Sequence, residues 1–229
     1  MKRTIELIIF DLDGTLIDSK VDIANAVNFT LRELKLKEVS HELIYSFVGN
    51  GVEPLIKRVM ESVTPPFEKK GSGGIERALT IFRSYYWDHL MDNTILYPHV
   101  IDVIKRLSEI KKAVVSNKSE RFVKKILDGL DIDKYFEIAL GGDSIKSKKP
   151  HPDILHLVME KLGVNGRRTL IVGDSAVDIE CGKRAGTFTC GVDYGYRDRS
   201  ELIKAGADWI IDDMDKLIGL IEPAYGVIQ

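Results

Sequence analysis

Two aspartates, Asp11 and Asp13, follow directly on the apolar run Leu7–Phe10 and precede Gly14 and Thr15. A carboxylate at such a position can attack phosphorus as a nucleophile, or exchange a proton with a leaving group or with water. Asp and Gly also favour turns, so a simple turn is the alternative interpretation of this motif taken alone. The chemistry therefore depends on which other groups reach the same place.

Further polar groups follow other short apolar runs in the sequence. They are Ser116, Asn117, Lys149, Asp174 and Asp178. Each could cap a helix or lie in a solvated loop. If the runs are parallel strands, however, these groups and the first two aspartates meet in one crevice at the carboxyl edge of the sheet. Clustered carboxylates repel unless a cation intervenes, and oxygen ligands beside a phosphate suit Mg²⁺.

Alternating short strands and helices are predicted to position these groups. The apolar runs are Leu7–Phe10, Ala113–Val115, Ile138–Leu140, Leu170–Val172, Thr189–Val192 and Trp209–Ile211. Their length and their Ile and Val content favour buried parallel strands. Helical stripes lie between most of them, such as the one carrying Ile154, Leu155, Val158 and Leu162. This alternation predicts an α/β fold with a doubly wound, mainly parallel sheet.

The interval from Asp18 to Leu96 contains no convincing strand and is too long for an ordinary crossover. It carries three helical stripes, which begin near Ile23, Val52 and Leu79. We therefore expect residues 18–91 to form an all-α cap inserted after the first motif, and residues 1–17 and 92–229 to form the α/β catalytic core. Within the cap, the glycine-rich stretch Lys69–Gly74 predicts a flexible loop.

The composition narrows the class of protein. The 229 residues are 44% hydrophobic and carry a net charge of −2, which is typical of a soluble globular protein of one or two domains. This charge balance and the lack of a long apolar run favour neither nucleic-acid nor membrane partners. The two cysteines, Cys181 and Cys190, lack CxxC spacing, so we expect reduced thiols in a cytoplasmic protein.

In their order along the chain, the polar motifs resemble the four motifs of the haloacid dehalogenase-like hydrolase superfamily. They are Asp11-Leu12-Asp13-Gly14-Thr15, Ser116, Lys149-Pro150 and Gly173-Asp174-Ser175 with Asp178. The resemblance implies a phosphomonoester hydrolase that works through an aspartyl-phosphate. It implies that Asp11 is the nucleophile and Asp13 the general acid and base. Phosphate would be bound by Ser116, Asn117 and Lys149.

The same resemblance implies a magnesium cofactor. The Mg²⁺ ligands would come from Asp11, the Asp13 carbonyl and Asp174, with Asp178 in support. Such a cation would neutralise the carboxylates and let an anionic nucleophile approach an anionic phosphoryl group.

Within the superfamily, the chain resembles the bacterial phosphoglycolate phosphatases. The shared stretches include Phe47–Gly51, Tyr97-Pro98, Gly141–Ser144, Gly195-Tyr196 and Gly206–Trp209. This resemblance implies that a small phosphorylated acid, 2-phosphoglycolate, is hydrolysed to glycolate and phosphate. The candidate substrate-selecting residues are Thr15, Gly49, Asn50, Gly51 and Arg58. A cap cation such as Arg58 would suit the glycolate carboxylate, although residues 49–51 also fit a helix–helix turn and Arg58 a solvated face.

Other functions remain open at this level. The same catalytic residues fit a related phosphatase acting on pyrophosphate, a sugar phosphate or a nucleotide, or a sugar-phosphate mutase, because the cap would decide among them. A receiver-like signalling module with a phosphorylated Asp is the non-enzymatic alternative, but it normally lacks a helical insertion. Either a monomer or a homodimer is compatible with the sequence.

Overall fold

The computed structural model describes residues 3–63 and 72–223. The chain forms two compact units, one of Met1–Asp18 with Leu96–Gln229 and one of Ser19–Ile95. The chain passes between them at two short strands, β3 (Ile17–Asp18) and β4 (Ile95–Leu96). Each unit is described below by itself.

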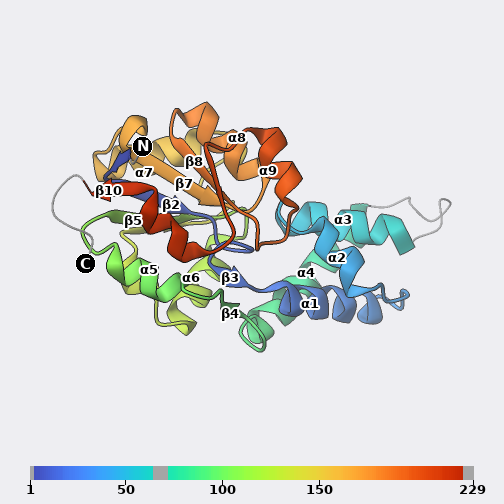
Figure 1. The fold of residues 1–229 in the computed structure, drawn as a ribbon. Helices are drawn as coiled ribbons and strands as arrows, with labels where there is room; N and C mark the ends of the chain where they lie inside the picture. Colours follow the sequence, from blue (N-terminus) through green and yellow to red (C-terminus); the bar gives the residue numbers. More distant parts are fainter. Residues whose placement is uncertain (1–2, 64–71, 224–229) are drawn as a thin grey trace. The chain divides into compact units, whose positions relative to one another are not determined.

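A six-stranded parallel sheet forms the centre of the larger unit (Figure 1). Its strands, in spatial order, are β6 (Ile138–Leu140), β5 (Lys111–Val115), β2 (Leu7–Phe10), β7 (Thr169–Gly173), β8 (Phe188–Val192) and β9 (Trp209–Ile211). Every neighbouring pair is parallel. All six predicted runs are strands of this sheet, so the predicted doubly wound α/β fold is confirmed.

Helices cover both faces of the sheet. Helices α5 (Val100–Arg106) and α6 (Glu120–Gly129) lie on the side opposite α7 (Asp153–Leu162) and α8 (Ala176–Ala185) (Figure 1). A further helix, α9 (Arg199–Ala205), connects β8 to β9. On the α7 side, Leu7 and Ile9 of β2 belong to one buried cluster with Leu155 and Val158. Because both faces are covered, the central strand is apolar throughout, as expected for a buried parallel strand.

The register of the central strands brings their carboxyl ends to one level. Phe10, the last residue of β2, is paired with Val114 on one side and with Val172 on the other. The backbone N–H of Asp11 donates to the Val172 carbonyl oxygen at 2.9 Å. From β2 the chain adds β5 and β6 on one side of the sheet, and then β7, β8 and β9 on the other. Open α/β sheets bind ligands at such a switch point.

Besides β3 and β4, two further strands and three short 3₁₀ helices were not predicted. Strand β1 (Arg3–Ile5) pairs in parallel with β10 (Ile221–Pro223) in a separate two-stranded sheet. The 3₁₀ helices are η1 (Asp133–Tyr135), η2 (Gly166–Arg168) and η3 (Met214–Gly219). These segments are too short for hydrophobic periodicity to distinguish them from loops.

The smaller unit is helical, as the stripes in its sequence predict. Its helices are α1 (Lys20–Glu33), α2 (His41–Phe47), α3 (Val52–Val63) and α4 (Ser72–His89). Helix α2 carried no predicted stripe, since Ile44 is its one buried residue. Inside this unit, the ring of Phe29 stacks on that of Tyr85 at a centroid distance of 4.0 Å, which joins α1 to α4.

The glycine-rich stretch of this unit differs from its prediction. Residues 69–71 lie outside the described part of the chain, but Ser72–Gly74 begin α4, so the predicted loop was wrong there. Glycine lowers the propensity for a helix without excluding one, and α3 lies close by, since a Cβ built at Gly74 would be 3.8 Å from the Met60 side chain. Among the described helices of both units, none is long and apolar enough to cross a membrane.

Candidate active site

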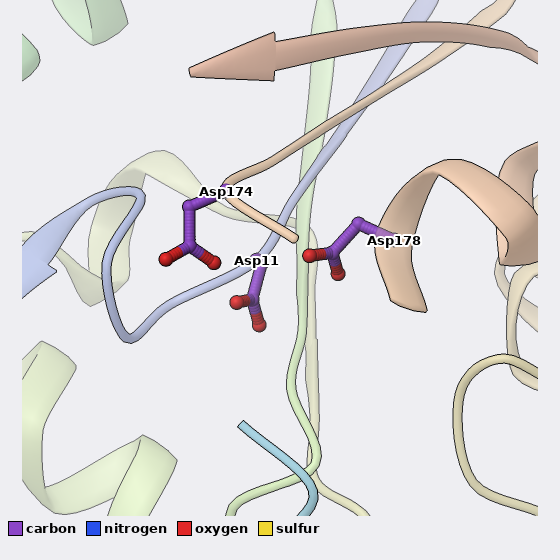
Figure 2. A group of neighbouring side chains, drawn as sticks. All are labelled: Asp11, Asp174 and Asp178. Carbon is purple, nitrogen blue, oxygen red and sulfur yellow. The ribbon is translucent and has the colours of Figure 1, made fainter. Parts of the chain in front are cut away.

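Three buried aspartates face one another beyond the carboxyl ends of β2 and β7. Asp11 follows β2, Asp174 follows β7, and Asp178 lies in the first turn of α8. One carboxylate oxygen from each lies within 4.8 Å of the others, and Figure 2 shows the three groups directed toward a common space. The structure therefore brings together three of the aspartates that the motifs single out.

This donor set fits a divalent cation. Burial, the neighbouring Asp178 and Asp13 raise the pKa of Asp11 to about 7, against the lowering effect of Lys149. Burial and the charges of Asp11 and Asp178 likewise raise the pKa of Asp174 well above its usual range. Carboxylates that resist ionisation in this way are stabilised when a cation shares their space, and hard oxygen ligands are those that Mg²⁺ prefers. The residues present thus fit the predicted metal site.

The side chain of Lys149 supplies one positive charge to the cluster. Its ammonium donates to Asp11 Oδ1 at 2.8 Å, to Asp178 Oδ1 at 2.6 Å and to the Val115 carbonyl oxygen at 2.8 Å. Burial alone would lower the pKa of Lys149, but the two carboxylates outweigh it and raise that pKa. The lysine is therefore charged and fixed beside the carboxylate that would act as nucleophile.

Asp178 uses its second oxygen to begin helix α8. Its Oδ2 accepts from the Ser175 hydroxyl at 2.6 Å and from the Ser175 backbone N–H at 3.2 Å. With Oδ1 bound to Lys149, both oxygens of Asp178 have partners within the protein. Asp178 thus holds Lys149 and α8 in place, which is compatible with the supporting part expected of it.

Asp13 lies in the turn that follows β2 and pairs with a lysine from another strand end. Lys118 Nζ donates to Asp13 Oδ1 at 2.6 Å, and the Lys118 side chain is only 8% exposed. From its position in the sequence beside Ser116, Lys118 could be either a surface residue or a contributor to a positive rim. The burial and the ion pair place it at the site, and the one available signal was its position directly after Ser116 and Asn117.

Gly14 gives the turn its shape. Its φ is +85°, and its N–H donates to the Ile17 carbonyl oxygen at 2.9 Å. A Cβ on Gly14 would lie 2.2 Å from Asp174 Oδ2. The position therefore needs glycine both for its left-handed backbone and for the close approach of the Asp174 carboxylate.

Ser116 and Asn117 lie at the same edge, directly after β5, and both are buried. Asn117 Nδ2 donates to the Lys149 carbonyl oxygen at 3.2 Å, which joins two of the predicted phosphate-binding segments. Ser116 Oγ accepts from the Lys118 N–H at 3.3 Å. Gly142 also binds the loop of residues 116–118, because its N–H donates to the Lys118 carbonyl oxygen at 2.8 Å.

The predicted substrate-selecting residues fall in both units. Thr15 follows the Gly14 turn in the larger unit, fully buried, and its hydroxyl has no hydrogen-bond partner among the described residues. Gly49 and Gly51 lie between α2 and α3 of the smaller unit, with φ of +122° and +88°, and Asn50 lies between them. In the same unit the Arg58 guanidinium lies 5.8 Å from the Phe47 ring centroid. Substrate selection by these residues stays a prediction.

Comparison with known proteins identifies the family. The model of the family described as haloacid dehalogenase-like hydrolase matches residues 8–192. A phosphoglycolate phosphatase of Colwellia psychrerythraea is 36% identical over 215 residues, which cover 93% of this chain and 95% of the relative. A phosphoglycolate phosphatase of Haemophilus influenzae is 35% identical over 229 residues, covering 96% of this chain and all of the relative.

A solved structure agrees with these relatives. The crystal structure of a predicted phosphoglycolate phosphatase from Haemophilus somnus 129pt has a TM-score of 0.89 and 33% sequence identity. The match covers 94% of this chain and 97% of that one. The chain therefore belongs to the haloacid dehalogenase-like hydrolase family, in which its curated relatives are phosphatases.

Proposed function

We propose that the enzyme is a magnesium-dependent phosphatase of the cytoplasm that hydrolyses 2-phosphoglycolate to glycolate and phosphate. The observation that carries the proposal is the Asp11 carboxylate, buried after β2, bound to Lys149 at 2.8 Å and clustered with Asp174 and Asp178. The choice of substrate is supported by relatives of nearly equal length that are named phosphoglycolate phosphatase.

The cation in this proposal is Mg²⁺, held by the Asp11 carboxylate, the Asp13 carbonyl and Asp174, with Asp178 in support. When bound, it would neutralise negative charge on the carboxylates and on the phosphoryl oxygens. Lys149 would bind a further phosphoryl oxygen by charge, while Ser116 and Asn117 would add neutral hydrogen bonds.

The first half of the proposed reaction transfers the phosphoryl group to Asp11. A carboxylate oxygen of Asp11 forms a bond to phosphorus as the bond from phosphorus to the glycolate oxygen breaks. Asp13 donates a proton to that departing oxygen, and glycolate leaves. The hydrogen bond from Lys118 to Asp13 Oδ1 would fix the Asp13 side chain before substrate arrives.

The second half returns the enzyme to its starting state. Asp13, now a carboxylate, accepts a proton from a water molecule, whose oxygen attacks the phosphorus of the aspartyl-phosphate. The bond from phosphorus to the Asp11 oxygen breaks, so inorganic phosphate is released and both aspartates regain their initial protonation.

Phosphate release from the purified enzyme with Mg²⁺ tests this proposal. The panel compares 2-phosphoglycolate with pyrophosphate, glucose 1-phosphate, phosphoserine and a nucleoside monophosphate. We expect kcat/KM to be highest for 2-phosphoglycolate by about tenfold or more, which is about 1.4 kcal/mol of transition-state discrimination. Asp11→Asn should abolish turnover of every substrate, because an amide cannot replace the nucleophile.

Other outcomes of the panel overturn different parts of the proposal. A different best substrate, still dependent on Asp11, would keep the phosphatase and reject the substrate. Turnover that survives Asp11→Asn would reject the nucleophile. A stable phospho-Asp11 without release of phosphate would favour a signalling role over hydrolysis.

A further inference from the structure

A turn that lies outside the four motifs contacts Asp174 directly. Residues Tyr194–Tyr196 follow β8, and the backbone N–H of Tyr196 donates to Asp174 Oδ2 at 2.7 Å. Asp174 is only 4% exposed, so little water competes for that oxygen. This hydrogen bond therefore fixes one oxygen of the Asp174 carboxylate. The loop after β8 thus contributes to the site, as the segments after β2, β5 and β7 do.

Gly195 brings the turn into contact with two parts of the site at once. A Cβ at this position would lie 2.4 Å from Asp174 Cβ and 2.4 Å from the Gly14 carbonyl oxygen. It would also lie 2.7 Å from Asp174 Oδ2. Gly14 approaches the same carboxylate, so Asp174 is enclosed between two glycines that leave no room for a side chain.

Tyr194 ties the turn to the segment that carries the proposed nucleophile. Its hydroxyl donates to the Thr15 carbonyl oxygen at 2.9 Å. Burial and the neighbouring Tyr97 raise the pKa of Tyr194, so the phenol keeps its proton and stays a donor. The ring centroids of Tyr97 and Tyr194 lie 4.8 Å apart, so the two rings pack against each other beside this hydrogen bond. Through Tyr194 and Gly195, the turn spans from the Asp13–Thr15 backbone to Asp174.

We propose that Tyr194–Tyr196 is a positioning element that sets Asp174 and the Asp13–Thr15 backbone at the separation a divalent cation requires. This inference rests on the proposed metal site. Groups that orient metal ligands without touching the metal commonly change its affinity by about 10- to 100-fold when they are altered. The turn thus contributes to metal affinity through geometry, and not through a ligand of its own.

Binding of Mn²⁺, followed by its electron paramagnetic resonance signal, tests the inference without relying on turnover. We expect Gly195→Ala to weaken Mn²⁺ binding by about tenfold or more, because its Cβ displaces Asp174. The matched control is Gly219→Ala in η3, where an added Cβ meets no atom within 4 Å, and its Mn²⁺ affinity should equal that of the parent enzyme. At saturating metal, Gly195→Ala should keep the parent KM for substrate, since it alters no predicted phosphate-binding group.

The possible results distinguish failure of the positioning element from failure of the proposed metal site. If the parent enzyme binds no Mn²⁺, the proposed metal site fails. If the parent binds Mn²⁺ and a folded Gly195→Ala binds it equally well, the positioning element is rejected. Should circular dichroism show that Gly195→Ala does not fold, Tyr194→Phe decides. Loss of its single hydroxyl should weaken Mn²⁺ binding while leaving the melting temperature close to that of the parent, and unchanged Mn²⁺ affinity would reject the inference.

Discussion

The ammonium group of Lys149 lies between the carboxylates of Asp11 and Asp178, 2.8 Å from one and 2.6 Å from the other. With the Val115 carbonyl oxygen as a third acceptor, all three of its N–H donors are used. In the proposed mechanism, a phosphoryl oxygen that binds Lys149 must replace one of these acceptors. In that mechanism Asp11 would be the acceptor that leaves Lys149 to attack phosphorus, so substrate binding and release of the nucleophile would occur together.

Lys149→Met should lower kcat/KM for the best substrate by about 100-fold or more, since it removes a charge aimed at the phosphoryl group and leaves two buried carboxylates unpaired. Steady-state kinetics measures the loss. The control is Lys146→Met, which removes an exposed lysine three positions earlier and should leave kcat/KM unchanged. Equal activity of the two variants would contradict the assignment of Lys149 to the site.

The stability of the metal-free enzyme should fall as pH rises toward neutrality. The pKa of Asp11 is raised from 3.8 to about 7 in the folded chain, so between these values the folded state holds a proton that the unfolded state has lost. The free energy of unfolding therefore decreases as pH rises through this window. Above it both states have lost the proton, so Asp11 causes no further change with pH. Asp174 acts in the same direction, because its pKa is also raised.

Thermal melts with and without Mg²⁺ at about pH 5 and about pH 8 check this sign. Mg²⁺ competes with protons for the carboxylates, so it should raise the melting temperature more at the higher pH. Asp11→Asn should flatten the pH dependence of the metal-free protein. An equal effect of Mg²⁺ at both pH values would count against binding at these aspartates.

Gly14→Ala should cost both stability and activity. Left-handed backbone strain alone costs an alanine roughly 1–2 kcal/mol, and Gly163→Ala isolates that cost because Gly163 has a φ of +67° with no atom near an added Cβ. At Gly14 the Cβ also displaces Asp174, so urea unfolding should show a larger loss. Only the Gly14 variant should lose activity, by about 10- to 100-fold. Equal losses at the two positions would reject the close approach to Asp174.

Arg58→Met should raise KM for 2-phosphoglycolate by about tenfold with little change in kcat, if this cap arginine recognises the substrate carboxylate. The neighbouring Lys57 is exposed on the same helix, so Lys57→Met controls for loss of a positive charge. Matched kinetics with a phosphomonoester that lacks a carboxylate should show no effect of Arg58→Met. A parallel rise of KM for both substrates would assign Arg58 to general attraction of anions.

The sheet could be predicted because burial on both faces leaves a strong trace in the sequence. Leu7–Phe10 and Leu170–Val172, for example, are continuous apolar runs. Strand β1 and helix α2 left no such trace, since each buries a single residue, Ile5 or Ile44. Their positions depend on contacts made only in the folded chain.

The aspartates could be picked out because they follow predicted strands and because the order of the motifs along the chain resembles that of the family. The contact of the Tyr194–Tyr196 turn with Asp174 could not, because its donor is a backbone N–H that every residue except proline carries. Lys118 is an intermediate case, since its position beside Ser116 is visible but its partner Asp13 is 105 residues away. The catalytic and metal-binding roles of all these residues stay predictions.

The central place of β2 in the sheet also has a consequence for biosynthesis. Strand β2, which leads to Asp11, is synthesised before both of its neighbours in the sheet, β5 and β7. Until Gly173 has emerged, the nascent chain holds an apolar strand with one or both edges unpaired. The chain must therefore shield β2 until β7 is made, and a chain that stops before β7 lacks one neighbour of β2 together with Asp174 and Asp178.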